Sequence, residues 1–206
     1  MEGHSRDSKA IGYFDHLALL ARNVATTLGS SDLTLLDTAV ERVIAEARTR
    51  TARGNKLMFI GNGGSAAIAS HMATDYSKNG RLRAMAFNDS AMLTCLANDM
   101  GYERAFAFQL ETHAQDGDLL IAISSSGNSR SILDACSTAR NRNCFIVTLS
   151  GFQQDNGLRR MGDVNFYVPA IEYGFVEVMH LAICHCILDF SMDLGIGANA
   201  MAPGKA

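Results

Sequence analysis

The sequence predicts a three-layer α/β sandwich, in which helices cover both faces of a parallel sheet. Short apolar runs predict five strands, at residues 57–61, 84–87, 119–124, 144–150 and 164–169. These runs do not alternate strictly between apolar and polar residues, which is expected of strands buried on both faces. Segments with helical character separate the runs, and this order of elements is typical of a parallel sheet.

Two helices are expected before the first strand, between about residues 10 and 53. Residues 33–54 place apolar side chains at helical spacing and end at Gly54, a residue type that often follows a helix. Residues 11–28 contain no turn signal and carry more apolar side chains than one layer over a sheet requires. We therefore expect this first helix to contact another copy of the chain.

The chain of 206 residues is expected to form a single domain, because its 48% hydrophobic content can supply one full core. The α/β core is expected at about residues 55–191. The last stretch, residues 192–206, is rich in small residues and is expected to be a flexible tail.

Composition also excludes several classes of partner. The net charge is −3 and no run of Lys or Arg is present, so nucleic acid is not expected to bind. Apolar runs stay shorter than the roughly 18 residues of a membrane span, and the polar N-terminus does not resemble a signal peptide. We expect a cytoplasmic protein with reduced cysteines.

Two loops rich in glycine and serine follow predicted strands, and each leads into a helix. The first is residues 61–65 (GNGGS) and the second is residues 124–129 (SSSGNS). Ligands of parallel sheets bind beyond the carboxyl ends of the strands, and helix N-termini attract anions. The second loop is therefore predicted to bind a phosphate group. The alternative is that both loops serve only as turns and helix caps.

Four residues on two predicted helices could bind a metal ion. His71 and Asp75 lie one helical turn apart, and Glu177 precedes His185 by about two turns. Two imidazoles and two carboxylates could form a tetrahedral zinc site. The alternatives are a surface pair for His71 and Asp75 and a hydrogen-bonded core residue for His185. Two thiols at Cys184 and Cys186 flank His185, but adjacent helical residues point about 100° apart, which argues against their joint ligation of zinc.

These motifs together resemble the SIS-domain proteins of the phosphoheptose isomerase type over nearly the whole chain. The resemblance rests on GNGGSAA with the histidine that follows, NDMGYE, GDLLIAISSSGNS and the paired His180 and His185. It implies a flavodoxin-like five-stranded parallel sheet and a homotetramer with active sites at subunit interfaces. It also implies bound zinc and the conversion of sedoheptulose 7-phosphate, through an enediolate, into D-glycero-D-manno-heptose 7-phosphate.

The resemblance further implies a role for each matching residue. Catalysis is assigned to Asp75, His185 and Glu177, and zinc binding to His71, Asp75, Glu177 and His185. Substrate binding is assigned to the two loops and to one pair on a later helix, that is, to Asn62, Gly63, Gly64, Ser65, Asn98, Asp99, Ser124, Ser125, Ser126 and Ser129.

The chain departs from the family pattern at three places. Asp75 replaces a glutamate, Glu177 replaces a glutamine, and residues 78–80 (KNG) stand where an arginine is usual. A second alignment places Glu177 on the family's glutamate and Cys184 on its histidine, which would leave an inactive site. The alternative function is then that of a non-catalytic regulator, which binds a protein partner or senses a sugar phosphate.

Overall fold

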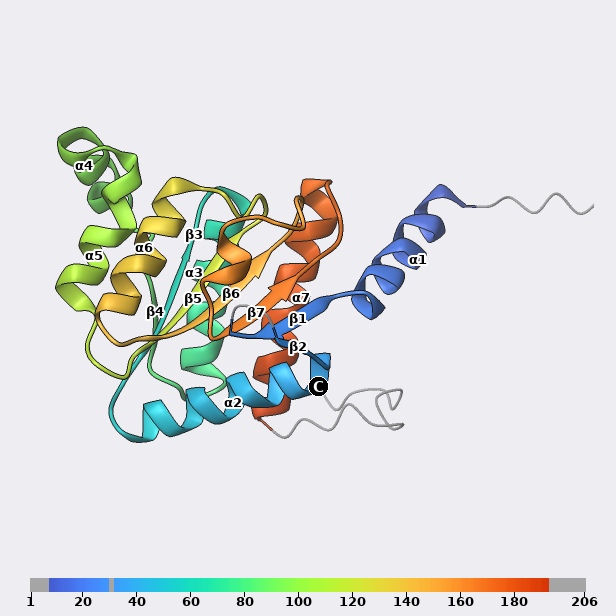
Figure 1. The fold of residues 1–206 in the computed structure, drawn as a ribbon, viewed down its shortest axis with the longest axis horizontal. Helices are drawn as coiled ribbons and strands as arrows, with labels where there is room; N and C mark the ends of the chain where they lie inside the picture. The colour runs from blue at the N-terminus through green and yellow to red at the C-terminus, as the bar shows by residue number, and fades with distance from the viewer. Residues whose placement is uncertain (1–7, 30–31, 193–206) are drawn as a thin grey trace, which may run out of the picture.

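Five parallel strands form the centre of the computed structural model, which describes residues 8–29 and 32–192 (Figure 1). These strands are β3 (Leu57–Gly61), β4 (Ala84–Ala86), β5 (Leu119–Ser124), β6 (Phe145–Ser150) and β7 (Val164–Tyr167). Their order across the sheet is β4-β3-β5-β6-β7, and every neighbouring pair is parallel. This order is that of flavodoxin-like sheets.

The whole sheet has seven strands rather than the predicted five, because two short strands precede the others in the chain. β1 (Ala25–Leu28) and β2 (Asp32–Thr34) form an antiparallel hairpin, and β1 also pairs antiparallel with β7. The two predicted helices are therefore present, but a hairpin that was not predicted separates them. The first helix, α1 (Lys9–Arg22), ends early, and the second, α2 (Leu36–Ala52), follows the hairpin.

Side-chain chemistry explains why residues 25–28 leave the expected helix. Thr26 and Thr27 are β-branched, and such residues favour strands over helices. The amide of Asn165 on β7 donates hydrogen bonds to Thr27 Oγ1 (3.0 Å) and to the carbonyl oxygen of Gly29 (2.7 Å). Pairing with β1 also satisfies backbone groups of β7 that would otherwise form an open edge.

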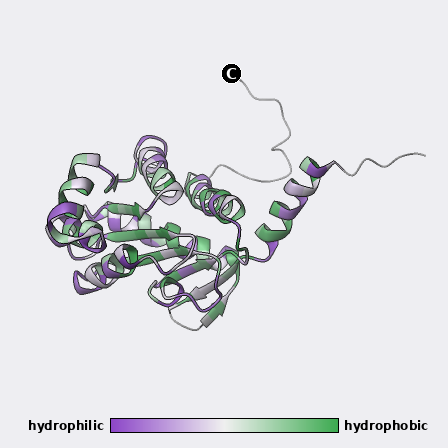
Figure 2. Ribbon diagram, turned by 90° about the horizontal axis from the view of Figure 1, so that it is seen from above, coloured by the Kyte–Doolittle hydropathy of each residue, from purple (hydrophilic) through white to green (hydrophobic). Residues whose placement is uncertain are grey.

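Helices cover both faces of the sheet and form the predicted outer layers. One face packs against α2, α3 (Gly64–Lys78) and α7 (Tyr173–Ser191), and the other packs against α5 (Ala105–His113) and α6 (Arg130–Asn141). The remaining elements are α4 (Ser90–Met100) and the 3₁₀ turns η1 (Tyr102–Arg104) and η2 (Leu158–Arg160). Figure 2 shows the strands as a hydrophobic layer between these helices.

Strand β3 shows why the apolar runs lack alternation. Leu57 and Phe59 join the core on one face of the sheet, whereas Met58 and Ile60 join the core on the other. All four side chains are fully buried. Both faces of the sheet are covered, as predicted. The expected tail at residues 192–206 lies outside the described residues, apart from Met192.

Helix α7 is, among the described residues, the one helix long and apolar enough to cross a membrane. In the fold its inner side contributes Val176, Ile183 and Ile187 to the core beneath α2 and α3. A core helix meets the same criterion of length and composition, so α7 is weak evidence for a membrane span.

A buried histidine attaches α7 to the sheet. His180 has no exposed surface, and its Nε2 donates a hydrogen bond to the carbonyl oxygen of Ser150 at the end of β6 (3.1 Å). Burial lowers the pKa of His180 to about 4, although the hydrogen bond to Ser150 opposes part of this shift. The imidazole is therefore neutral near pH 7.

We predict that His180 makes the stability of the fold depend on acidity. The unfolded chain protonates this histidine near pH 6.5, whereas the folded chain resists protonation down to about pH 4. Stability should therefore fall as the pH drops through this window, by on the order of 2 kcal/mol between pH 6.5 and pH 5. Urea unfolding at several pH values measures this loss.

Two variants provide the comparison for this measurement. His180→Gln keeps an amide N–H that can bond Ser150 and does not titrate, so its loss of stability should be smaller by the stated amount. His113→Gln changes an exposed histidine and should keep the wild-type dependence. An unchanged pH dependence in His180→Gln would contradict the prediction.

Candidate active site

The two glycine- and serine-rich loops meet at the carboxyl edge of the sheet, where β3 and β5 are hydrogen-bonded neighbours. β3 leads into α3 and β5 leads into α6, and these helices lie on opposite faces of the sheet. Their N-termini therefore diverge from adjacent strands. In open α/β sheets this divergence creates the crevice in which ligands bind.

A pocket of about 320 Å³ occupies this crevice. The structure brings all eight loop residues of the predicted substrate site around it, together with two residues of α7. The lining residues are Asn62, Gly63, Gly64, Ser65, Ser124, Ser125, Ser126, Ser129, Tyr173 and Glu177.

Backbone hydrogen bonds from the segment after β6 hold the second loop in place. Gly151 N–H donates to the carbonyl oxygen of Ser125 (3.0 Å), and Leu158 N–H donates to that of Gly127 (2.9 Å). Gly127 has a φ of +64°, and a β-carbon there would collide with the side chain of Asn156. The loop therefore requires glycine at this position and has a defined shape.

The same loop retains unused hydrogen-bonding capacity. The hydroxyl oxygen of Ser125 is buried and has no partner among the described residues. A buried hydroxyl without a partner costs about 1–3 kcal/mol. The N-terminus of α6, a helix of 12 residues, follows the loop directly and favours negative charge. These features suit an anion with several acceptor oxygens, such as a phosphate.

Glu177 reaches the pocket from α7 and packs against the start of α3. A β-carbon on Gly64 would collide with the Glu177 carboxylate, so these two positions are sterically matched. The first turn of a helix stabilises negative charge through its free N–H groups. The carboxylate therefore lies beside the free N–H groups at the start of α3.

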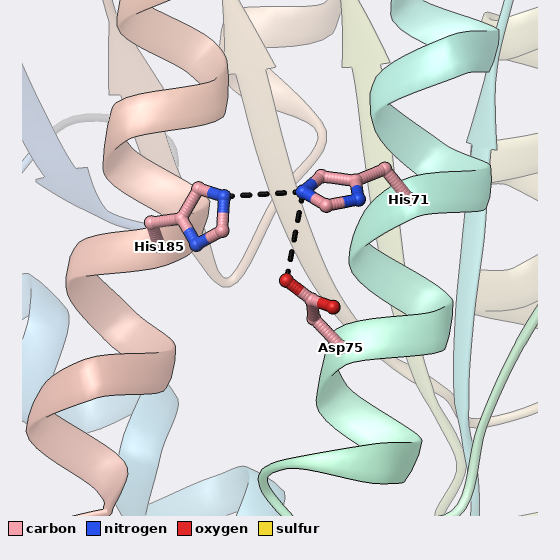
Figure 3. A group of neighbouring side chains, drawn as sticks. All are labelled: His71, Asp75 and His185. Carbon is pink, nitrogen blue, oxygen red and sulfur yellow. Dashed lines mark hydrogen bonds and ion pairs between the residues drawn. The ribbon is translucent and has the colours of Figure 1, made fainter. Parts of the chain in front are cut away.

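A second group of side chains lies farther along α3 and α7 (Figure 3). His71 and Asp75 project from α3 and His185 projects from α7. His71 Nε2 is 3.3 Å from His185 Nε2 and 3.5 Å from Asp75 Oδ2. Each residue offers a ligand atom, and these three atoms all lie within 4.8 Å of one another.

The spacing of this group fits a zinc ion. Tetrahedral ligands at about 2.0–2.1 Å from zinc are separated by roughly 3.3–3.4 Å, close to both measured distances. Two imidazoles, one carboxylate and an open fourth position are typical of catalytic rather than structural zinc sites. The His71 side chain is 51% exposed, so ligands from outside could reach the group.

Three of the four predicted metal ligands therefore come together, and Glu177 lies apart from them in the pocket. The predicted substrate-binding pair, Asn98 and Asp99, also lies outside the pocket. Asn98 and Asp99 occupy the end of α4, where Asn98 Nδ2 donates to Asp99 Oδ1 (2.8 Å), and neither lines the pocket.

His185 and Cys184 are the two residues of α7 that the alternative alignments place on the family's histidine. His185, not Cys184, faces His71 across the two helices. Cys184 is buried, and burial raises the pKa of its thiol to about 12. A protonated buried thiol is a poor zinc ligand, which also argues against a site formed by Cys184 and Cys186.

Two aromatic residues of the site were missed by the sequence reasoning. Tyr173 lines the pocket from the first turn of α7 and packs edge-to-face against Phe152, with ring centroids 4.9 Å apart. Tyr102 donates a hydrogen bond to Asn62 Oδ1 (2.6 Å). Tyr102 lies within the motif NDMGYE, so its motif was visible, but its contact with residue 62 was not.

Comparison with known proteins gives consistent matches to one family. The SIS domain model matches residues 13–151. A phosphoheptose isomerase of Thiobacillus denitrificans is 37% identical over 157 residues, which cover 72% of this chain and 79% of that protein. One from Bradyrhizobium sp. is 35% identical over 178 residues, which cover 82% of this chain and 88% of that protein.

Solved structures show the same fold. A phosphoheptose isomerase from Francisella tularensis aligns with a TM-score of 0.77 at 25% identity, over 93% of this chain and 100% of that chain. Phosphoheptose isomerase GmhA from Neisseria gonorrhoeae aligns with a TM-score of 0.77 at 24% identity, over 89% of this chain and 97% of that chain.

We predict that His71, Asp75 and His185 bind zinc without Glu177. Replacing either histidine by alanine removes a direct ligand, so zinc affinity should fall by at least roughly 100-fold, more than the 10–100-fold typical of outer-shell changes. Glu177→Gln should leave the affinity nearly unchanged. Competition with a chromogenic chelator measures these affinities without reference to activity. Equal losses in Glu177→Gln and His71→Ala would instead support four ligands.

Proposed function

The chain belongs to the SIS domain family, among the phosphoheptose isomerases, and on this premise we propose that it converts sedoheptulose 7-phosphate into D-glycero-D-manno-heptose 7-phosphate. The observation that carries the proposal is the pocket between β3 and β5. It combines a serine loop suited to a phosphate with a carboxylate from α7, which is also one of the two helices that bear the His–Asp group.

The serine loop binds the phosphate end of the substrate in this proposal. Ser124, Ser125, Ser126 and Ser129 supply hydroxyl donors, and the N-terminus of α6 supplies positive potential. A phosphate monoester carries about −1.5 to −2 charges at pH 7, so these groups complement it. Such contacts act equally on the ground state and the transition state and therefore mainly set KM.

The reaction moves one proton between adjacent carbons. Asp75 takes the proton from C1 of the ketose, the electron pair forms the C1–C2 double bond, and the carbonyl electrons move onto O2. Return of the proton to C2 and transfer of a second proton from O1 to O2 complete the aldose. Asp75 and His185 act as the acid–base pair, each type of group contributing typically 10²–10⁴-fold. A zinc ion held by His71, Asp75 and His185 would supply positive charge that stabilises the enediolate oxygens.

Glu177 is the second carboxylate that could serve as base, because it lines the pocket whereas Asp75 does not. Asp75 follows Ser65 by ten residues along α3, which corresponds to about 15 Å of helix. Because of this separation, the serine loop and Asp75 of one chain could not act on the same substrate molecule, so the proposed function requires several chains to assemble. A neighbouring chain would have to bring its His–Asp group to the serine loop of the first.

We propose a homotetramer with active sites shared between chains. Helix α1 projects from the body of the molecule (Figure 1) and exposes Ile11, Phe14 and Leu19. Exposed apolar side chains on a projecting helix indicate a surface that another chain covers. Asn98 and Asp99, which lie outside the pocket of their own chain, are then available to a neighbour. The proposal also places the protein in the cytoplasm, because charged sugar phosphates do not cross membranes unaided.

The function is tested by incubating the purified protein with sedoheptulose 7-phosphate and with five-, six- and eight-carbon ketose phosphates. Appearance of an aldose phosphate in the NMR spectrum is the expected result, with the seven-carbon substrate turned over fastest. Binding of the sugar phosphate without turnover would instead support the non-catalytic regulator.

Matched amide variants distinguish the catalytic roles of the Asp75 and Glu177 carboxylates. Asp75→Asn should abolish turnover, a fall in kcat of at least 10²-fold, because an amide cannot accept the C1 proton. Glu177→Gln, which introduces the residue expected from the family resemblance, should keep kcat within a few-fold of the wild type. Near-normal kcat in Asp75→Asn, or a dead Glu177→Gln with its zinc retained, would reverse the two roles.

Shared active sites predict complementation between two inactive variants. Asp75→Asn lacks the base, and Ser129→Asp places a negative charge in the phosphate loop. If each site combines a loop and a base from different chains, coexpression of the two should recover about a quarter of wild-type activity, since random pairing unites the intact parts once in four sites. Light scattering should show a tetramer. A monomer at micromolar concentration, or absence of recovery, would refute shared sites.

A further inference from the structure

A chain of hydrogen bonds connects Tyr102 to the phosphate loop. The hydroxyl of Tyr102 donates to Asn62 Oδ1 (2.6 Å), and Asn62 Nδ2 donates to Ser129 Oγ (2.8 Å) and Ser131 Oγ (3.0 Å). The chain joins the 3₁₀ turn η1, the loop after β3 and the start of α6. Tyr102 itself does not line the pocket, whereas Asn62 and Ser129 do.

Counting donors and acceptors shows what this arrangement does to Ser129. A serine hydroxyl has one proton to donate and two lone pairs to accept hydrogen bonds. Asn62 fills one lone pair of Ser129. Ser131 is almost completely buried, and its Oγ is 3.3 Å from Ser129 Oγ, a distance at which either hydroxyl could donate to the other. We assign the donor role to Ser131, because Ser129 lines the pocket and can direct its own proton to a ligand. Ser129 can then act only as a donor, and its proton is left for the pocket.

Ser129 does not take part in ordinary helix capping. It occupies the N-cap position of α6, where a serine oxygen normally accepts a hydrogen bond from the backbone of the first turn. No such side-chain bond is present here. The hydroxyl is engaged by Asn62 instead, and the first backbone N–H groups of α6 keep their capacity to bind an anion.

The orientation of the Asn62 amide decides whether this arrangement exists. With the amide reversed, Oδ1 would accept the protons of Ser129 and Ser131, and Ser129 would have none to offer a ligand. In the structure the phenol of Tyr102 donates to Oδ1. With the amide reversed, the phenol would have to accept from Nδ2 and its own proton would lose this acceptor, so the donation favours the orientation in which the serines accept. Partial burial raises the pKa of Tyr102, which keeps the phenol protonated.

We propose that Tyr102 is a positioning residue of the phosphate site: it orients Asn62, and Asn62 makes Ser129 a hydrogen-bond donor toward the phosphate. The inference deepens the proposed function, since it concerns the same pocket. It also predicts the class of ligand that the pocket prefers. A phosphate dianion presents only acceptor oxygens, so it matches a site from which only protons are offered.

Three variants test the network, with dissociation constants for inorganic phosphate from ³¹P NMR titration and with KM and kcat for sedoheptulose 7-phosphate. Tyr102→Phe removes the donor to Asn62 Oδ1. Ser131→Ala removes an acceptor of Asn62 Nδ2 and, with it, the hydroxyl assigned as donor to Ser129. Each should weaken phosphate binding and raise KM roughly 2- to 12-fold, the range for one hydrogen bond, with kcat unchanged. Ser137→Ala, which removes an exposed hydroxyl that donates to the Leu133 carbonyl of the same helix, is the matched control and should change neither constant.

The double variant Tyr102→Phe/Ser131→Ala distinguishes orientation from independent contacts. If both residues act through Asn62, the loss of phosphate affinity in the double variant should be close to the larger of the two single-variant losses. It should be well below the product of the two single-variant fold-changes. A multiplicative effect, wild-type phosphate affinity in Tyr102→Phe, or a loss confined to kcat would overturn the proposal. If the wild type binds phosphate but turns over no sugar phosphate, the proposed isomerase function is refuted. The phosphate affinities of the variants then still test the role of Tyr102. A wild type that binds no phosphate would overturn both.

Discussion

The divergence of α3 and α6 from the neighbouring strands β3 and β5 is the constraint on which the candidate site depends. Because these helices leave adjacent strands toward opposite faces of the sheet, their N-termini and the loops before them open a crevice. Serine hydroxyls and free backbone N–H groups from both loops then converge on one pocket. On strands that were not neighbours, the same residues would form two unrelated turns.

Neutral polar side chains hold these loops within an apolar frame. Asn62 ties the first loop to the start of α6, Asn156 packs beneath Gly127 in the second, and His180 joins α7 to the end of β6. Amides and a neutral imidazole can be buried without the large desolvation cost of a charge, provided that they are hydrogen-bonded. The shape of the anion-binding loops is thus set by uncharged groups, so the positive potential at the helix N-terminus is not cancelled by a buried carboxylate within the second loop.

The charged and titratable groups are instead divided between two places along α3 and α7. Glu177 packs against the first turn of α3, and His71, Asp75 and His185 lie farther along the same pair of helices. This division means that one chain presents a phosphate loop and a separate, accessible His–Asp group. Under the proposed function, assembly of several chains is what unites the two, so quaternary structure and catalysis are linked.

The sequence by itself determined the parallel sheet, the two loops and the pairing of His71 with Asp75, because apolar runs, Gly–Ser turns and one-turn helical spacing are local signals. Only the tertiary structure decided that residues 25–28 form a strand, since the Asn165 that pairs with Thr27 is 138 residues away. It likewise decided that Glu177 packs on Gly64 and that Tyr102 donates a hydrogen bond to Asn62. Periodicity reports which face of an element is buried, but which side chains meet depends on how distant segments pack, and no local pattern contains that information.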